Sequence, residues 1–275
     1  KRSNLSPFIL KIGSRAWLDR NSFSEAISLV SIRVYIMRNL NPVNYVSSTI
    51  HSSDVDRIFG ASWQLLGPTS RLTNRGDYIA TEIAGSKVFA VRTKDGLRAF
   101  RNVCRHRGAR LLPEGTGHCT TIRCPYHQWV WGEDGSLLNV PWWGDDPAFN
   151  KSDWALDAVE LYEWRGFLFV SLSPEIALEN QLGALISELE DEPIERYKWV
   201  HEERLVFDAN WKIYTDNFVE GYHIPGIHPK FHSAIEFEKF ETIALEGMVK
   251  MTAPPREELF YRGKWLWMWP NWTLS

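Results

Sequence analysis

Cys104-Arg-His106-Arg-Gly108 and Cys124-Pro-Tyr-His127 are the two stretches from which the fold of this chain can be inferred. Each contains one cysteine and one histidine, and seventeen residues separate His106 from Cys124. Two thiolates and two imidazoles on two short stretches are typical of one inorganic centre held between two loops.

Iron–sulfur chemistry accounts for the mixture of residue types. In a [2Fe–2S] cluster of Rieske type, histidines replace cysteines on one of the two irons, which raises the reduction potential. Zinc also accepts two cysteines and two histidines. Zinc fingers, however, usually pair Cys with Cys and His with His locally, whereas here each local pair is mixed. We therefore predict a Rieske-type cluster, with zinc as the minor alternative.

These stretches belong to a longer motif that resembles a known family. Cys104-Arg-His-Arg-Gly-Ala-Arg110, Cys124-Pro-Tyr-His-Gln-Trp129 and Asp134-Gly135 are similar to the Rieske domain of ring-hydroxylating oxygenase alpha subunits. The resemblance implies that Cys104, His106, Cys124 and His127 are the cluster ligands. Respiratory Rieske proteins usually carry a further cysteine in each loop, and neither loop of this chain has one. The third cysteine of this chain, Cys119, is predicted to be a small buried strand residue.

Hydrophobic periodicity predicts a small antiparallel β domain over about residues 60–172, with the two cysteine-histidine loops at its tips. Asp95-Gly96 and Asp134-Gly135 predict hairpin turns. The expected elements are a short amphipathic helix at 54–63, strands at 77–82, 87–93, 97–100 and 164–172, and a helical segment at 176–189.

A second group of chemically capable residues lies between Asn210 and His228. His223 and His228 are five residues apart, which on a continuous helix would place them about 140° apart. Pro225 and Gly226 stand between them, so we expect the helix to end near Tyr222–His223 and the chain to bend His228 back. The spacing also predicts that Asp216, Glu220 and His223 share one helix face.

Two histidines and a carboxylate on one face of an iron form the facial triad of non-haem Fe(II) oxygenases. The family resemblance implies His223 and His228 as ligands of a mononuclear iron. It also implies Glu220 as the acid that joins a cluster histidine of one subunit to an iron histidine of its neighbour. Many members have Asp there, and Glu resembles the choline- and carnitine-oxidising branch. The candidate catalytic residues are Glu220, Asn217 and Asp216.

One departure from the family concerns the third iron ligand. It is usually an Asp that follows the strand resembled by Trp265–Asn271, and no Asp lies beyond Asp216 in this sequence. We therefore expect a chain truncated within its catalytic domain, with an incomplete iron site.

Domain organisation is expected as an N-terminal extension (1–45, poorly ordered), a Rieske domain with its preceding helix (46–175) and a partial catalytic domain (176–275). The predicted class is α+β, and the resemblance implies a helix-grip-like second domain.

Residues 1–40 carry seven Lys/Arg against two acids, which is compatible with a transit peptide. The protein is otherwise expected in the cytoplasm. A net charge of −3 disfavours nucleic-acid binding, and the lack of an eighteen-residue apolar run predicts no membrane span.

The resemblance implies an oxygenase component, an oxidoreductase that acts on paired donors. An NAD(P)H-dependent reductase or a ferredoxin would supply electrons, and O2 would hydroxylate a small substrate, either a quaternary amine or an aromatic compound. The full-length protein is expected to form a homotrimer or a larger oligomer. The alternatives are a Rieske ferredoxin-like electron carrier, a catalytically incomplete fragment and a zinc-stabilised interaction domain.

Overall fold

The computed structural model describes residues 40–144, 146–256 and 263–275. These described residues form two compact units, those of 52–206 and those of 40–51 together with 207–275. The predicted domain bounds at 46–175 and 176–275 stay predictions, and most of the predicted extension at 1–45 lies outside the described residues. Among the described helices, none combines the length and the apolar character needed to cross a membrane.

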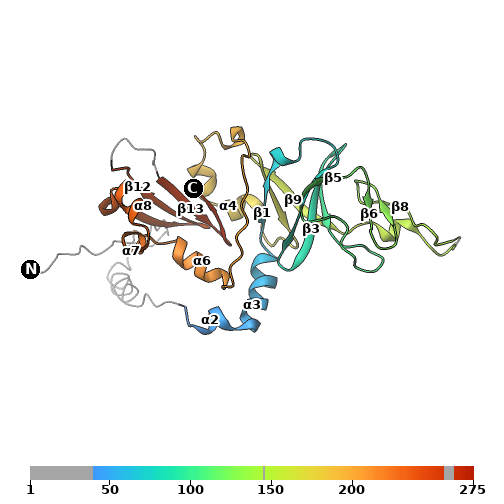
Figure 1. The fold of residues 1–275 in the computed structure, drawn as a ribbon, viewed down its shortest axis with the longest axis horizontal. Coiled ribbons are helices and arrows are strands. Elements are labelled where there is room, and N and C mark those ends of the chain that lie inside the picture. Colours follow the sequence, from blue (N-terminus) through green and yellow to red (C-terminus); the bar gives the residue numbers. More distant parts are fainter. Residues whose placement is uncertain (1–39, 145, 257–262) are drawn as a thin grey trace, which may run out of the picture. The chain divides into compact units, whose positions relative to one another are not determined.

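A fully antiparallel sheet dominates the unit Ser52–Val206 (Figure 1). Within the described residues its strand order is β1-β10-β9-β4-β3-β2-β5. The strands are β1 Gln64–Pro68, β2 Asp77–Ile83, β3 Ser86–Thr93, β4 Gly96–Arg101, β5 Gly115–His118, β9 Ala158–Trp164 and β10 Phe167–Ser171. A smaller sheet consists of β6 Ile122–Arg123, β7 Val130–Trp131 and β8 Leu137–Asn139.

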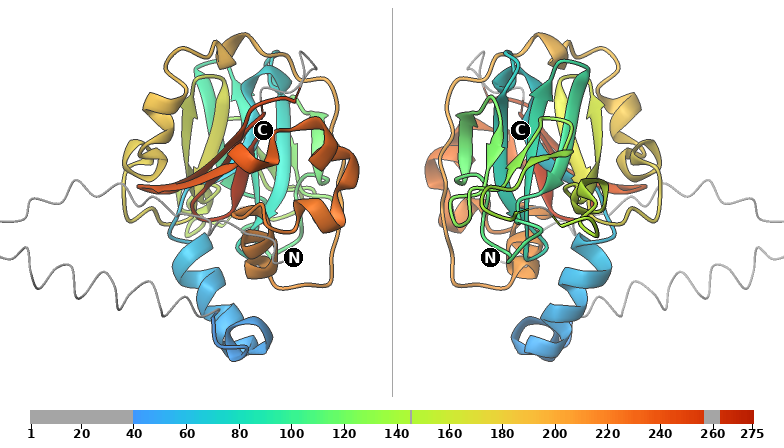
Figure 2. Two further views of the ribbon diagram at one scale, coloured as in Figure 1. Left: turned by 90° about the vertical axis from the view of Figure 1, so that its left-hand side faces the viewer. Right: turned by 90° about the vertical axis from the view of Figure 1, so that its right-hand side faces the viewer.

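Strand β3 of the large sheet is buried on both faces. Phe89 packs into one hydrophobic cluster and Val88 into another, and both are 0% exposed. Since successive side chains of a strand point to opposite faces, the sheet must be covered on both sides. Phe89 shares its cluster with Trp129 and Trp131, from the smaller sheet and its loop. Figure 2 (right) shows that sheet and its loops, in green, nearest the viewer.

The predicted strands and turns are largely confirmed. Asp95-Gly96 joins β3 to β4, and Asp134-Gly135 joins β7 to β8. The segment predicted as one strand at 164–172 instead contains a turn at Arg165 and Gly166, which have φ angles of 47° and 87°. The helix predicted at 176–189 is broken at Gly183, where φ is 51°, into α4 Leu178–Leu182 and α5 Leu185–Glu188.

The helix expected at 54–63 lies earlier in the chain, as α3 Ser48–Asp54 followed by the π-helical turn η1 Val55–Phe59. Short 3₁₀ turns complete the unit, at η2 Thr69–Arg71, η3 Lys151–Trp154 and η4 Ile194–Arg196.

The described residues of the second unit form a four-stranded antiparallel sheet with helices beside it. The strand order is β11-β12-β13-β14, and a core of Ile224, Ile235, Phe240, Met251 and Ala253 packs between the helical segment and the sheet. Its elements are α2 Val43–Val46, α6 Trp211–Phe218, α7 Ile224–Ile227, α8 Pro229–Ala234, η5 Phe237–Lys239, β11 Glu241–Leu245, β12 Met248–Ala253, β13 Gly263–Met268 and β14 Trp272–Leu274.

The two Asp-Gly turns allow a matched test of the core beneath the smaller sheet. Both glycines have positive φ, so alanine costs about 1–3 kcal/mol of backbone strain at Gly96 or Gly135. A Cβ on Gly135 would also lie 2.5 Å from the buried ring of Phe100, whereas nothing lies within 4 Å at Gly96. We expect Gly135→Ala to lower the free energy of unfolding by about 1–3 kcal/mol more than Gly96→Ala, measured by urea denaturation. Equal losses would contradict the close approach to Phe100.

Candidate functional site

The two cysteine-histidine loops share one backbone design. In the first loop, the Cys104 N–H donates to the Ala109 carbonyl at 2.7 Å, and the Gly108 N–H donates to the Cys104 carbonyl at 2.9 Å. The second loop repeats both bonds at the same spacing, from the Cys124 N–H to the Trp129 carbonyl at 2.8 Å and from the Gln128 N–H to the Cys124 carbonyl at 3.1 Å. Each cysteine is therefore fixed at both its N–H and its carbonyl.

Gly108 and Gln128 occupy the same place in the two loops, and both have left-handed φ angles, 72° and 59°. Glycine adopts this conformation freely, while glutamine there costs about 1–2 kcal/mol. The bonds around Cys124 and the burial of Trp129 hold Gln128 in this shape. A glutamine does not indicate a left-handed backbone conformation, so the sequence did not reveal that Gln128 corresponds to Gly108.

The four predicted cluster ligands come together in the structure. The rings of His106 and His127 have centroids 4.6 Å apart, and the thiol of Cys124 lies close enough to that of Cys104 to raise its pKa. Neither cysteine forms a disulfide, and they are 3% and 0% exposed. Burial raises the pKa of the Cys104 thiol, while the N–H groups of His106 and Arg107 lower it.

The imidazole nitrogens indicate which inorganic centre fits between the two cysteine-histidine loops. His106 Nδ1 and His127 Nδ1 are buried and have no hydrogen-bond partner among the described residues. An unpaired buried nitrogen of this kind costs about 1–3 kcal/mol unless something binds it. Two buried thiols and two unpaired ring nitrogens fit a [2Fe–2S] cluster, in which each iron takes two protein ligands.

Aromatic side chains surround the cluster histidines. Trp129 is 1% exposed and stacks on the His106 ring, with centroids 4.7 Å apart and an interplanar angle of 4°. Trp143 meets both rings edge-on, with centroids 6.1 Å from His106 and 5.7 Å from Trp129. Burial lowers the pKa of His106, and the charges of His127 and Arg107 lower it further. The stacking holds the ring plane of His106.

The second candidate site begins where α6 ends, and two predictions about it are wrong. The helix stops at Phe218 rather than near Tyr222–His223, so Glu220 and His223 lie beyond it and do not share a helix face with Asp216. The reason is a close packing contact at Gly221. A Cβ there would lie 2.4 Å from the ring of Phe240, so the chain turns directly over that ring.

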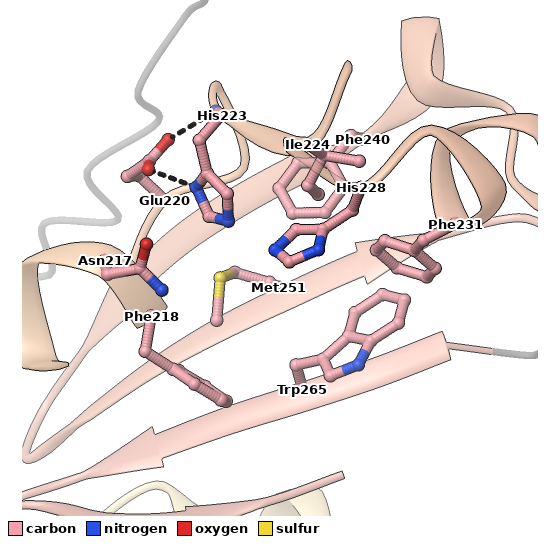
Figure 3. Close-up of a pocket in the computed structure, with 10 residues that line it drawn as sticks. All are labelled: Asn217, Phe218, Glu220, His223, Ile224, His228, Phe231, Phe240, Met251 and Trp265. Atoms are coloured by element: carbon pink, nitrogen blue, oxygen red, sulfur yellow. Dashed lines mark hydrogen bonds and ion pairs between the residues drawn. The ribbon is translucent and has the colours of Figure 1, made fainter. Parts of the chain in front are cut away.

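The predicted convergence of the two histidines is confirmed. Pro225 stands in the first turn of the one-turn helix α7, which carries the chain back so that the rings of His223 and His228 have centroids 5.2 Å apart. Both line a cavity of about 360 Å³ (Figure 3). The other lining residues are Asn217, Phe218, Glu220, Ile224, Phe231, Phe240, Met251 and Trp265.

Glu220 is the residue that orients His223. Its Oε1 lies 2.5 Å from His223 Nδ1, and its Oε2 accepts hydrogen bonds from the backbone N–H groups of Tyr222 and His223. The dashed lines in Figure 3 mark the contacts to His223. A carboxylate on Nδ1 leaves Nε2 as the nitrogen free to bind a metal, the usual arrangement around metal-bound histidines. The two imidazoles thus fit the histidine part of a facial triad.

The other two predicted catalytic residues differ in position. Asn217 lines the cavity, whereas Asp216 is not among the lining residues. The carboxylate of Asp216 accepts a hydrogen bond from the Tyr45 hydroxyl at 2.5 Å, and this bond raises the pKa of Tyr45. Their catalytic roles stay predictions. Sequence reasoning missed Tyr45 and the lining residue Met251, because neither belongs to a recognisable spacing.

Two family models match the chain. The model described as Rieske [2Fe-2S] domain matches residues 62–149, and the model described as ring hydroxylating alpha subunit (catalytic domain) matches residues 194–265. The first range contains the four predicted cluster ligands, and the second contains Glu220, His223 and His228.

Individual relatives point the same way. The carnitine monooxygenase oxygenase subunit of Escherichia coli K12 is 31% identical over 243 residues, covering 81% of this chain and 64% of the relative. The chloroplastic choline monooxygenase of Amaranthus tricolor is 27% identical, covering 74% of this chain and 48% of the relative. A crystal structure of a quaternary ammonium Rieske monooxygenase with L-carnitine is 30% identical with a TM-score of 0.76, covering 83% of this chain and 64% of that one.

The chain spans less than two thirds of the length of these relatives. Its first unit is the antiparallel β domain expected from the sequence, and its second is part of a mixed α+β catalytic domain. The chain therefore belongs to the Rieske oxygenase alpha subunits, is related to the carnitine and choline monooxygenases, and covers only part of its full-length relatives.

Proposed function

We propose that this chain is the electron-accepting and oxygen-activating part of an oxygenase that hydroxylates a small quaternary amine. Cys104, His106, Cys124 and His127 would hold the [2Fe–2S] cluster, and His223 and His228 would hold Fe(II). When bound, the cluster supplies single electrons, and the iron offers open coordination positions for oxygen chemistry. An NAD(P)H-dependent reductase or a ferredoxin is the proposed electron donor.

The observation that carries this proposal is the convergence of His223 and His228 on one cavity, with Glu220 bonded to His223 Nδ1. An electron carrier needs a cluster domain alone, and it has no use for a cavity with two histidines at its wall. The match of residues 194–265 to a catalytic domain supports the same choice. A zinc-stabilised interaction domain would account for neither observation.

The walls of the cavity favour a cationic substrate. Phe231, Phe240 and Trp265 present aromatic side chains, and Glu220 brings a carboxylate to the same lining. A quaternary ammonium group is attracted to aromatic faces by about 0.5–2 kcal/mol per ring through cation–π interaction. Relatives named for carnitine and choline agree with this choice. An aromatic hydrocarbon is the second candidate, because a naphthalene dioxygenase structure also matches, with a TM-score of 0.70.

Glu220 has two parts in the proposed mechanism. Its carboxylate keeps a proton on His223 Nδ1, so that Nε2 keeps its lone pair towards the metal. Its second role follows from the family resemblance, in which this acid joins a cluster histidine of one subunit to the iron histidine of a neighbour. We therefore propose electron delivery between subunits through Glu220, in an oligomer of three or more chains.

The cluster ligands are tested by replacing Cys104 and, as a control, Cys119. Cys104→Ser removes a thiolate that we propose binds iron, and we expect the purified protein to lose its visible absorption. Cys119→Ser is the matched control, because Cys119 lies outside both ligand loops. It should keep the spectrum of the unsubstituted protein. A coloured Cys104→Ser variant, or a colourless unsubstituted protein, would contradict the assignment.

The role of Glu220 is tested by metal titration and turnover. Glu220→Ala leaves His223 Nδ1 without its carboxylate, and we expect Co(II) affinity at the histidine pair to fall by about 10- to 100-fold. Turnover should be lost, and the cluster spectrum should be unchanged. Glu246→Ala is the control, because Glu246 is exposed in the turn between β11 and β12. Unaltered affinity and turnover in Glu220→Ala would remove Glu220 from the mechanism.

A further inference from the structure

Three methionines lie on the sheet of the second unit, and only one of them faces the cavity. Met248 on β12 pairs with Met268 on β13, while Met251 pairs with Trp265. Positions 248 and 251 are an odd number of residues apart, so their side chains project from opposite faces of the strand. Met251 lines the cavity together with His223 and His228, and the other two methionines do not.

The three methionines are equally shielded from bulk solvent. Met248, Met251 and Met268 are 2%, 3% and 1% exposed. The surroundings of Met251 are different, because it reaches from the sheet towards the part of the cavity that carries Asn217, His223 and His228 (Figure 3). A thioether is the most easily oxidised group in that lining.

We propose that Met251 is oxidised by a by-product of the protein's own reaction: peroxide formed in the cavity converts its thioether to a sulfoxide. This inference rests on the proposed function of the histidine pair. Peroxide arises when dioxygen takes up two electrons and two protons and no substrate atom receives oxygen. Hydrogen peroxide then transfers one oxygen atom to the Met251 sulfur, which is oxidised by two electrons, and the other oxygen leaves as water.

The sulfoxide changes the site that produced it. Met251 belongs to an apolar cluster with Ile224, Phe240 and Ala253, and a sulfoxide there is polar, chiral and without a hydrogen-bond donor from that cluster. The oxygen also occupies space in the cavity. The modified protein should therefore bind metal and substrate less well, so that unproductive reduction of oxygen stops itself. Methionine sulfoxide reductases reverse the modification.

Iron-dependent oxidation tests this inference. The protein and a His223→Ala/His228→Ala variant are titrated with Fe(II) without oxygen, then exposed to air with ascorbate as electron donor and catalase to remove free peroxide, and digested for peptide mass spectrometry. Both proteins keep the cluster ligands, so iron released from the cluster is the same in each. We expect Met251 in the iron-loaded protein to oxidise roughly tenfold or more faster than Met248 and Met268, which are reached only through local opening. The variant should lose this selectivity.

Met251→Leu supplies the functional arm, because leucine replaces methionine with little change in volume. It should keep its Fe(II) affinity after the same exposure to air and ascorbate that lowers the affinity of the unsubstituted protein. Equal oxidation of the three methionines in iron-loaded protein would overturn the inference and leave the proposed function standing. Selectivity that persists without the histidines would also overturn it. A titration that finds no histidine-dependent Fe(II) site would overturn both.

Discussion

Burial of the two loop cysteines in an aromatic core is the constraint on which this structure depends. Cys104 and Cys124 belong to the same hydrophobic cluster as Phe89, Trp129 and Trp131, and they are as buried as those residues. A ligand loop anchored in this way cannot shift without disturbing the packing of the sheet. The large sheet, the small sheet and the aromatic shell around His106 therefore serve one purpose, which is to hold four donor groups at fixed places.

The second unit achieves the same result with fewer constraints. A close contact between Gly221 and Phe240 turns the chain out of α6, and a single helical turn begun by Pro225 returns it. Glu220 then contacts the His223 ring at Nδ1, while the backbone N–H groups of Tyr222 and His223 hold its carboxylate in place. The cavity beside these residues has apolar walls from the sheet. Its donors are on a connecting segment rather than on a strand.

Much of this arrangement was predictable from the sequence, and the failures have physical causes. Spacing indicated that the two cysteine-histidine loops belong together, and the Asp-Gly dipeptides indicated the hairpins, because both signals are local. The end of α6 was misplaced because the contact that sets it comes from Phe240, nineteen residues after Gly221. The break at Gly183 was missed, since an isolated glycine inside a helical pattern is often tolerated. Tyr45 contacts Asp216 across 171 residues, a separation that no local pattern reveals.

The matching hydrogen bonds of the two loops have a consequence for assembly. Each loop supplies one cysteine and one histidine, while a Rieske cluster puts the cysteines on one iron and the histidines on the other. Under the proposed assignment, each iron therefore spans both loops, and the cofactor acts as a cross-link between residues 104–109 and 124–129. Removal of any ligand would free a loop at one iron and strain the other. Binding of the cluster and ordering of the two loops would then be coupled.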